Sequence, residues 1–260
     1  MTDKHSSSRH PRLLPAAALL SLLAACSRTT EPTVTPPSTA PIRVFAAASL
    51  TASFQAIAAA FEQQHPGQKV ELHFAGSPQL ALQLCEGAAA DVFAAADQPN
   101  MQKVVDGGVT AAAPVEFARN ELAIAVRAGN PKGVRGLGDL ARGELKVVLC
   151  APDVPAGKYA RQALAAQQLT VRSVSDEPSV KAVVGKVQLG EVDAGVVYAT
   201  DTKVDGVEGV AIPSAQNVVA SYPIAVLARG GNRAGGEALV AFVRSEAGRA
   251  LLRQHGFVSP

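Results

Sequence analysis

The stretch Ile42-Arg43-Val44-Phe45-Ala46-Ala47-Ala48-Ser49-Leu50-Thr51 decides the fold. Its apolar run over residues 42–47 predicts a buried strand that ends in small residues and a hydroxyl. A helix should follow, because four apolar residues recur at the spacing of one helix face: Phe54, Ile57, Ala58 and Phe61. Ser49 stands where that helix begins, and a helix start leaves about four backbone N–H groups without partners, so an anion can bind there. An ordinary N-cap role for Ser49 or Thr51 explains the same pattern.

The rest of the chain repeats this alternation of strand and helix. Further strands are predicted at residues 69–75, 92–96, 121–128, 146–150, 194–198 and 222–228. Helices are predicted around Leu80 and Leu84, and over residues 100–106, 138–142, 155–168, 178–190 and 235–256. This alternation predicts an α/β fold, in which a parallel sheet carries helices on its faces.

Proline and glycine mark several of the predicted helix ends. Ser77 fits an N-cap and Pro78 the first helical position, and Gly87 closes that helix. Pro155 and Pro178 fit the first position of two later helices. The amides that follow these prolines have no side-chain acceptor nearby in the sequence, so they are predicted to be free donors.

Five of these positions form a candidate site. Four strand-to-helix junctions carry small residues or hydroxyls, and one further strand ends in a phenol: Ser49, Ser77, Ala156, Val180 and Tyr198. In open α/β sheets such junctions meet at the carboxyl edge, where ligands bind. The set offers amides and hydroxyls but no cation, which suits a compact and fully ionised oxyanion, since a charge-assisted hydrogen bond contributes about 1.5–3 kcal/mol. Taken alone, each position is better explained by capping, helix packing or core packing.

Composition narrows the class of protein. The chain has 260 residues, enough for one large or two modest domains, with 48% hydrophobic and 18% charged residues. Trp is absent and aromatic residues make up only 4%, which argues against stacking platforms for sugars or bases. Residues 1–25 hold three of the 24 basic and one of the 22 acidic residues, so 21 of each remain and the rest is formally neutral. A nucleic-acid partner is therefore not expected.

The N-terminal segment reads as a targeting signal. Lys4, Arg9 and Arg12 precede a short apolar run, and Leu23-Ala24-Ala25-Cys26 resembles a bacterial lipobox. Residues 1–25 are predicted to be a lipoprotein signal peptide and Cys26 the lipidated residue, followed by a Thr/Pro-rich tether over residues 26–41. The protein is then expected outside the cytoplasm, anchored to the outer face of the cell membrane or periplasmic. An ordinary secretory signal with a chance cysteine is the alternative.

Two further cysteines, Cys85 and Cys150, leave the question of a disulfide open. A compartment outside the cytoplasm permits a bridge, yet one cysteine falls in a predicted helix and the other at a strand end. Free buried thiols are the favoured interpretation of the sequence.

Six motifs together resemble the substrate-binding proteins of molybdate ABC importers. They occur in the same order over the whole segment from Ile42 to Phe257. The motifs are Val44-Phe45-Ala46-Ala47-Ala48-Ser49-Leu50-Thr51, Phe74-Ala75-Gly76-Ser77, Ala90-Asp91-Val92-Phe93-Ala94-Ala95-Ala96-Asp97, Asp153-Val154-Pro155-Ala156-Gly157, Gly195-Val196-Val197-Tyr198 and Tyr222-Pro223-Ile224-Ala225-Val226.

The resemblance implies a type II periplasmic-binding-protein fold, in which two lobes close on one tetrahedral anion. Each lobe would hold a mostly parallel sheet flanked by helices, and two crossing strands would join them. Lobe 1 would comprise residues 42–120 and 224–260, and lobe 2 residues 121–223. The protein would not be an enzyme and would use no cofactor. It would act as a monomer that passes molybdate or tungstate to an ABC permease, and molybdenum would enter only as the oxyanion.

The resemblance also implies a role for each candidate residue. Ser49 and Ser77 would donate hydroxyl and amide, Ala156 and Val180 their backbone amides, and Tyr198 its hydroxyl. Val180 matches least well, because the sequence around it agrees only loosely with the family pattern. Pro78 departs from that pattern, since a donor usually stands there and proline lacks an N–H.

Other functions fit the sequence less well than an oxyanion-binding transport protein. A receptor for sulfate, thiosulfate or another oxyanion remains open. A secreted serine hydrolase with Ser49 or Ser77 as nucleophile lacks a plausible histidine partner and a Gly-x-Ser-x-Gly elbow. A ligand-sensing domain of a transcription regulator conflicts with the N-terminal signal. Residues 152–159 do not form a phosphate loop, because Pro152 replaces its first glycine and Tyr159 its Ser or Thr.

Histidines and acidic residues give no catalytic or metal pattern. The three histidines of the folded part, His65, His73 and His255, show no metal-ligand spacing. Asp91 and Asp97 would repel an anion if they lined its site, so turn and capping roles are predicted for them.

Overall fold

The computed structural model describes residues 40–260, which belong to one compact unit. The predicted signal peptide, the predicted lipidation of Cys26 and nearly all of the predicted tether lie outside the described residues. Within the described part, no helix is long and apolar enough to cross a membrane.

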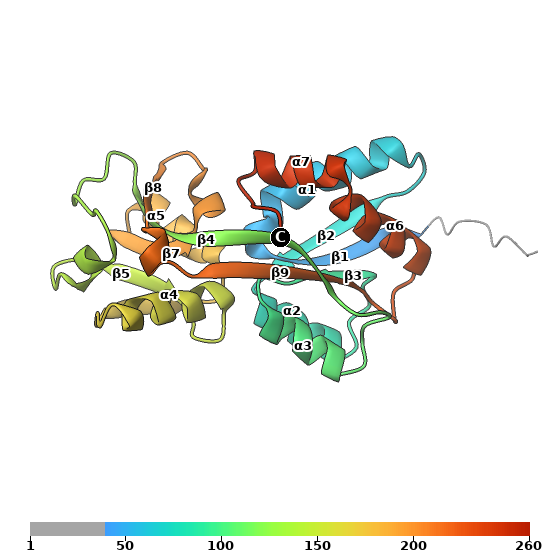
Figure 1. Cartoon of the computed structure of the whole chain (residues 1–260), viewed down its shortest axis with the longest axis horizontal. Coiled ribbons are helices and arrows are strands. Elements are labelled where there is room, and N and C mark those ends of the chain that lie inside the picture. The colour runs from blue at the N-terminus through green and yellow to red at the C-terminus, as the bar shows by residue number, and fades with distance from the viewer. Residues whose placement is uncertain (1–39) are drawn as a thin grey trace, which may run out of the picture. The chain divides into compact units, whose positions relative to one another are not determined.

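One nine-stranded sheet runs through the structure (Figure 1). Its order is β2-β1-β3-β9-β4-β7-β5-β6, and β8 pairs with β4 outside this path. The strands are β1 (Ile42–Ala47), β2 (Val70–Ala75), β3 (Val92–Ala94), β4 (Val115–Arg127), β5 (Val147–Cys150), β6 (Ser173–Glu177), β7 (Ala194–Tyr198), β8 (Val207–Ala211) and β9 (Val219–Val226).

Two long strands connect the two halves of this sheet. The first part of β4 pairs with β9, and its second part pairs with β7 and β8. β9 continues along β3 in the other half. The predicted α/β architecture with two crossing strands is therefore confirmed. The predicted lobe boundaries at residues 120/121 and 223/224 fall inside β4 and β9, and they remain a prediction.

Pairing directions depart in part from the predicted parallel sheets. β1 is parallel to β2 and β3, and β5 is parallel to β6 and β7. Every antiparallel pair among the strands includes β4 or β9. The prediction placed the start of β4 at residue 121, six residues late, because Glu116 and Arg119 interrupt the apolar pattern in its first half.

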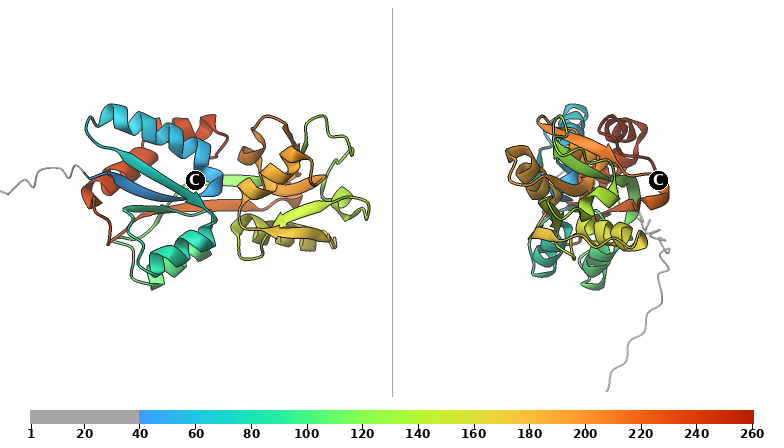
Figure 2. Two further views of the ribbon diagram at one scale, coloured as in Figure 1. Left: turned by 180° about the vertical axis from the view of Figure 1, so that it is seen from behind. Right: turned by 90° about the vertical axis from the view of Figure 1, so that its left-hand side faces the viewer.

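Helices cover both faces of each half (Figures 1 and 2). In the first half α1, α6 and α7 pack on one face of the sheet, and α2 and α3 pack together on the other. In the second half α4 and α5 pack against β5 and β7. The helices are α1 (Thr51–Gln64), α2 (Ser77–Cys85), α3 (Gln98–Asp106), α4 (Pro155–Ala166), α5 (Val180–Leu189), α6 (Arg233–Arg244) and α7 (Glu246–Gln254).

Two further predictions about the elements are corrected by the structure. β6 and β8 were missed, because polar residues dominate β6 and glycine interrupts β8, so neither has an apolar run. The last predicted helix, residues 235–256, is two helices, since Ser245 ends α6 and caps α7 by accepting a hydrogen bond from the amide of Gly248. Cys85 and Cys150, the two cysteines among residues 40–260, are both free thiols, and only Cys150 is buried, since Cys85 is exposed.

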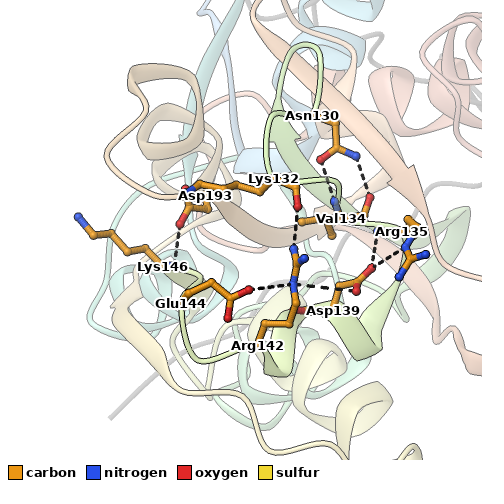
Figure 3. A network of polar contacts seen from close by, with 9 residues as sticks. All are labelled: Asn130, Lys132, Val134, Arg135, Asp139, Arg142, Glu144, Lys146 and Asp193. Carbon is orange, nitrogen blue, oxygen red and sulfur yellow. Dashed lines mark hydrogen bonds and ion pairs between the residues drawn. The ribbon is translucent and has the colours of Figure 1, made fainter.

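Polar contacts hold the long connection between β4 and β5 (Figure 3). Asn130 bonds twice to the backbone of Val134, at 2.8 and 3.0 Å. The Arg142 guanidinium donates to the carbonyl of Lys132 at 2.8 Å. Asp193, at the start of β7, accepts from the amide of Lys146 at 2.8 Å and so ties the end of the connection to the sheet.

Asp91 anchors the C-terminal part of the chain to β1. Its buried carboxylate accepts from the amide of Arg43 at 2.8 Å and from the amide of Asn232 at 2.6 Å. Asn232 then caps α6 and donates to the carbonyl of Ala40 at 2.6 Å. The predicted turn role of Asp91 therefore extends to a link between segments far apart in the sequence.

Replacing Asp91 with Ala should lower the free energy of unfolding by about 3 kcal/mol, because two buried amides lose a charged acceptor. Chemical denaturation measures this loss. Asp106→Ala, at an exposed position of α3, is the matched control and should change stability by less than about 0.5 kcal/mol. Equal effects of the two substitutions would contradict the anchoring role.

Candidate oxyanion-binding site

A small pocket gathers all five predicted site residues. Backbone and side chains from both halves of the sheet line it: Ala47, Ala48, Ser49, Gly76, Ser77, Ala96, Val154, Pro155, Ala156, Ser179, Val180 and Tyr198. None of these residues carries a charge, so the pocket offers neutral hydrogen-bond donors.

Some of the helix starts at this pocket lack the side-chain caps found elsewhere, although the Ser179 side chain caps α5. Side chains of Asp97, Asn232 and Ser245 cap α3, α6 and α7. No side chain among residues 40–260 caps the 3₁₀ turn Ala48–Leu50 that leads into α1, nor α2 or α4. The uncapped amides carry the positive end of the helix dipole, so an anion in the pocket would supply the missing acceptor.

The two serines act differently from the predicted N-caps. Gly76, not Ser77, is the N-cap of α2, and the Ser77 Oγ accepts from the amide of Ala96 at 3.1 Å. The Ser49 Oγ lies 3.1 Å from the hydroxyl oxygen of Tyr222. The Ser77 oxygen is therefore used as an acceptor, and its hydroxyl hydrogen remains available for donation. The same holds for Ser49 when Tyr222 is the donor of their bond.

Tyr198 has an orphaned hydroxyl. The residue is 1% exposed, and its hydroxyl oxygen has no hydrogen-bond partner among residues 40–260. Burial, reinforced by the nearby Tyr222 hydroxyl, raises the pKa of Tyr198 well above that of a free phenol. The phenol is therefore neutral and able to donate. A buried hydroxyl left unpaired costs about 1–3 kcal/mol, so this group indicates a ligand acceptor.

Ala156 and Val180 present backbone at two helix starts. Pro155 is the first residue of α4, as predicted, and Ala156 follows it. Pro178 does not begin α5: Val180 does, after the N-cap Ser179. The Ser179 side chain accepts from the amide of Ala182 at 3.4 Å and leaves the Val180 amide without that cap.

Three residues behind the pocket wall were not predicted. Tyr222, on β9, contacts Ser49 through its hydroxyl and packs edge-on against the Tyr198 ring, with centroids 5.7 Å apart. Asp201 and Lys181 form an ion pair, with Oδ1 and Nζ 3.7 Å apart. The family-like motif Tyr222-Pro223-Ile224-Ala225-Val226 could have drawn attention to Tyr222. Nothing in the sequence placed Asp201 beside Lys181.

Other titratable groups are accounted for by capping and packing. Asp97 caps α3 as predicted, accepting from the amide and side chain of Asn100 at 3.1 and 2.8 Å. His65 stacks on Phe61, and His73 packs in a tilted arrangement against Phe45. Residues 40–260 hold no cluster of three His, Cys, Asp or Glu side chains that could bind a metal cation.

Comparison with known proteins identifies the family. The family described as bacterial extracellular solute-binding protein matches residues 42–258. The molybdate-binding protein ModA of Mycobacterium tuberculosis is 45% identical over 224 residues, which cover 84% of this chain and 85% of the relative. The chain belongs to the bacterial extracellular solute-binding proteins. The predicted membership of a solute-binding family is thus confirmed.

Solved structures agree with this assignment. The periplasmic molybdate-binding protein of Azotobacter vinelandii superposes with a TM-score of 0.71 at 19% identity, covering 84% of this chain and 99% of that one. The sulfate-binding protein SubI of Mycobacterium tuberculosis gives a TM-score of 0.73 at 20% identity, covering 84% and 86%. At these identities the two structures show the fold alone, and they confirm the predicted periplasmic-binding-protein fold.

The ionisation of Asp201 should make the stability of this solute-binding protein depend on pH. Burial raises the pKa of Asp201 to about 6, although Lys181 and the Tyr198 amide act in the opposite direction. A carboxyl group whose pKa is higher in the folded than in the unfolded state binds its proton more tightly when the protein is folded. Its protonated form therefore stabilises the folded protein. This contribution is complete below the unfolded pKa of about 3.9 and is lost as the pH rises through 6.

The measurement compares wild type with Asp201→Asn by denaturant unfolding at pH 8 and pH 5. The contributions of all other titrating groups cancel when the unfolding free energy of the variant is subtracted from that of wild type at each pH. Wild type should gain about 1 kcal/mol relative to the variant on going from pH 8 to pH 5. A difference that stays constant, or that moves in the opposite direction, would show that Asp201 is ionised normally in the folded protein.

Proposed function

We propose that this protein captures molybdate, and also tungstate, in the pocket and delivers it to an ABC permease. The observation that carries the proposal is the convergence of unpaired donors on one small space without a cation. Within the part of the chain that the structure describes, the Tyr198 hydroxyl is buried and has no partner, and the starts of α2 and α4 have no side-chain cap. The resemblance to molybdate-binding relatives adds the identity of the anion.

The donor set matches the chemistry of a dianion that stays ionised. Ser49, Ser77 and Tyr198 would donate hydroxyl hydrogens, and Ala156 and Val180 backbone amides. Neutral dipoles in a dry pocket compensate for the lost hydration of such an anion, and each bond to a charged acceptor contributes about 1.5–3 kcal/mol. Molybdate and tungstate would be ligands carried by the protein rather than cofactors.

The two halves of the structure meet beside the pocket. A Cβ atom added at Gly76, in the turn between β2 and α2, would collide with the carbonyl oxygen of Pro178, in the turn between β6 and α5. Gly76 has φ −61° and ψ 140°, a conformation open to any residue. The glycine is therefore needed for close approach between the halves, and this approach brings Ser77 opposite Val180.

The protein is proposed to work outside the cytoplasm, attached to the membrane. The lipobox at Cys26 would anchor the protein to the outer face of the membrane, and the tether would hold the binding domain near the permease. The protein would work as a monomer. The family's extracellular character supports this location, while Cys26 itself lies outside the described residues.

Sulfate is the strongest alternative ligand. A sulfate-binding protein shares the fold, and sulfate carries the same charge as molybdate in a smaller tetrahedron. A serine hydrolase fits less well, because no histidine lines the pocket and the oxygens of Ser49 and Ser77 already contact Tyr222 and the Ala96 amide. Labelling of either serine by a phosphonate would favour the hydrolase.

Calorimetric titration of residues 27–260 tests the proposal. Molybdate and tungstate should bind one-to-one, and excess sulfate should not displace them. Tyr198→Phe and Ser49→Ala should each weaken binding by roughly tenfold, because each removes one hydrogen bond to a charged acceptor. Ser214→Ala, at an exposed position outside the pocket, should leave affinity unchanged. Tight sulfate binding without molybdate binding would assign the protein to the alternative ligand.

Gly76→Ala should weaken molybdate binding by roughly tenfold or more, because the added methyl group separates the two halves of the pocket. The free energy of unfolding without ligand should change little. Gly143→Ala is the matched control, since a Cβ atom there meets nothing within 4 Å. Wild-type affinity in Gly76→Ala would show that contact at Pro178 is not needed for binding.

A further inference from the structure

A buried carboxylate lies directly behind the anion pocket. Asp201 is 1% exposed and sits in the 3₁₀ turn Ala199–Thr202 that follows β7. Its Oδ2 accepts from the amide of Tyr198 at 3.3 Å. Its Oδ1 is buried and has no hydrogen-bond partner among residues 40–260. The negative charge of Asp201 is thus fixed next to a residue that lines the pocket.

Lys181 is the cation that faces this carboxylate. It follows Val180 directly at the start of α5, and its Nζ lies 3.7 Å from the Asp201 Oδ1, too far for a hydrogen bond. Its side chain is 38% exposed. The ion pair therefore joins the end of β7, which carries Tyr198, to the helix start that carries Val180.

Other groups around Asp201 offer no positive charge. The field of Asp201 acts on the Tyr198, Tyr222 and Cys150 side chains, from β7, β9 and β5. Burial, the largest cause, and the Asp201 charge both raise the pKa of each group, so all three stay neutral near pH 7. Among the described residues Lys181 is the cation that lowers the pKa of Asp201.

An unbalanced carboxylate at this place would oppose the function of the pocket. Like charges repel strongly in a poorly solvated interior, and the repulsion doubles for a dianion. The pocket lining itself carries no positive charge that could offset it. Some group outside the lining must therefore balance Asp201 if a dianion is to bind tightly.

We propose that Lys181 is this group: it neutralises Asp201 and thereby sets the affinity of the pocket for a doubly charged oxyanion. Asp201 in turn positions Tyr198 by accepting from its amide. Lys181 acts as a positioning and charge-balancing residue that does not touch the ligand. This inference rests on the proposed function, because it requires that the pocket binds an oxyanion.

Four variants test the inference by calorimetric titration with molybdate at pH 7.5. Lys181→Met keeps the apolar stem and removes the charge, so it should weaken binding by roughly tenfold or more. Asp201→Asn keeps the length of the side chain and an oxygen acceptor for the Tyr198 amide, so its affinity should equal or exceed that of wild type. The double variant should regain wild-type affinity, since neither charge remains. Lys69→Met, which breaks an exposed ion pair with Glu62, is the control for loss of a lysine and should have no effect.

The rescue separates a charge effect from a structural one. Wild-type affinity in Lys181→Met would overturn the inference, as would a loss of affinity that Asp201→Asn does not repair. If wild type binds no molybdate, the proposed ligand is wrong, and the same series is titrated with sulfate, where the same order of affinities is expected. Failure of wild type to bind either anion would overturn the inference together with the proposed function.

Discussion

Unpaired hydrogen-bond donors at helix starts are the constraint on which the structure around the pocket depends. Folded proteins rarely bury amides and hydroxyls without acceptors. Among residues 40–260, α3, α5, α6 and α7 satisfy this rule with side-chain caps, whereas α2 and α4 begin at the pocket without one. The Tyr198 hydroxyl adds a further buried donor. The fold concentrates these groups in one place, and a bound oxyanion would satisfy them together.

The crossing strands make this convergence possible. β4 pairs with strands of both halves, and β9 runs beside it. Tyr222 on β9 touches the Ser49 hydroxyl from the first half and packs on the Tyr198 ring from the second. One side chain on a connecting strand therefore supports donors from both halves. A movement of the halves about β4 and β9 would change the pocket without disrupting either set of helices.

Charge is kept out of the pocket lining and placed behind it. The lining residues are neutral, while Asp97 and Asp201 are buried nearby. Burial raises the pKa of Asp97, and Asn100, Lys158 and Lys103 act in the opposite direction. Lys181 has the corresponding role at Asp201. The charged groups near the pocket thus lie behind its neutral lining, where Lys181 pairs with Asp201.

Local sequence determined the elements that carry the site. The apolar run of β1, the small residues at the junctions and Pro155 at the start of α4 predicted where the candidate donors lie, because these signals act over a few residues. The apolar pattern did not predict β6, because this strand lies at the edge of the sheet and its sequence is mostly polar. The sequence also predicted that Ser49 and Ser77 cap helices. Local pattern cannot distinguish a capping hydroxyl from one that bonds to a residue far away in the chain.

Only the tertiary structure decided how these groups meet. The bonds from Tyr222 to Ser49 and from the Ala96 amide to Ser77 span 173 and 19 residues. The contact between Gly76 and Pro178, and the pairing of Lys181 with Asp201, likewise join segments that are distant in the chain. By itself the sequence determined which donors exist and which family the chain resembles. The packing of two sheet halves determined which donors share a pocket, because that depends on contacts no local pattern encodes.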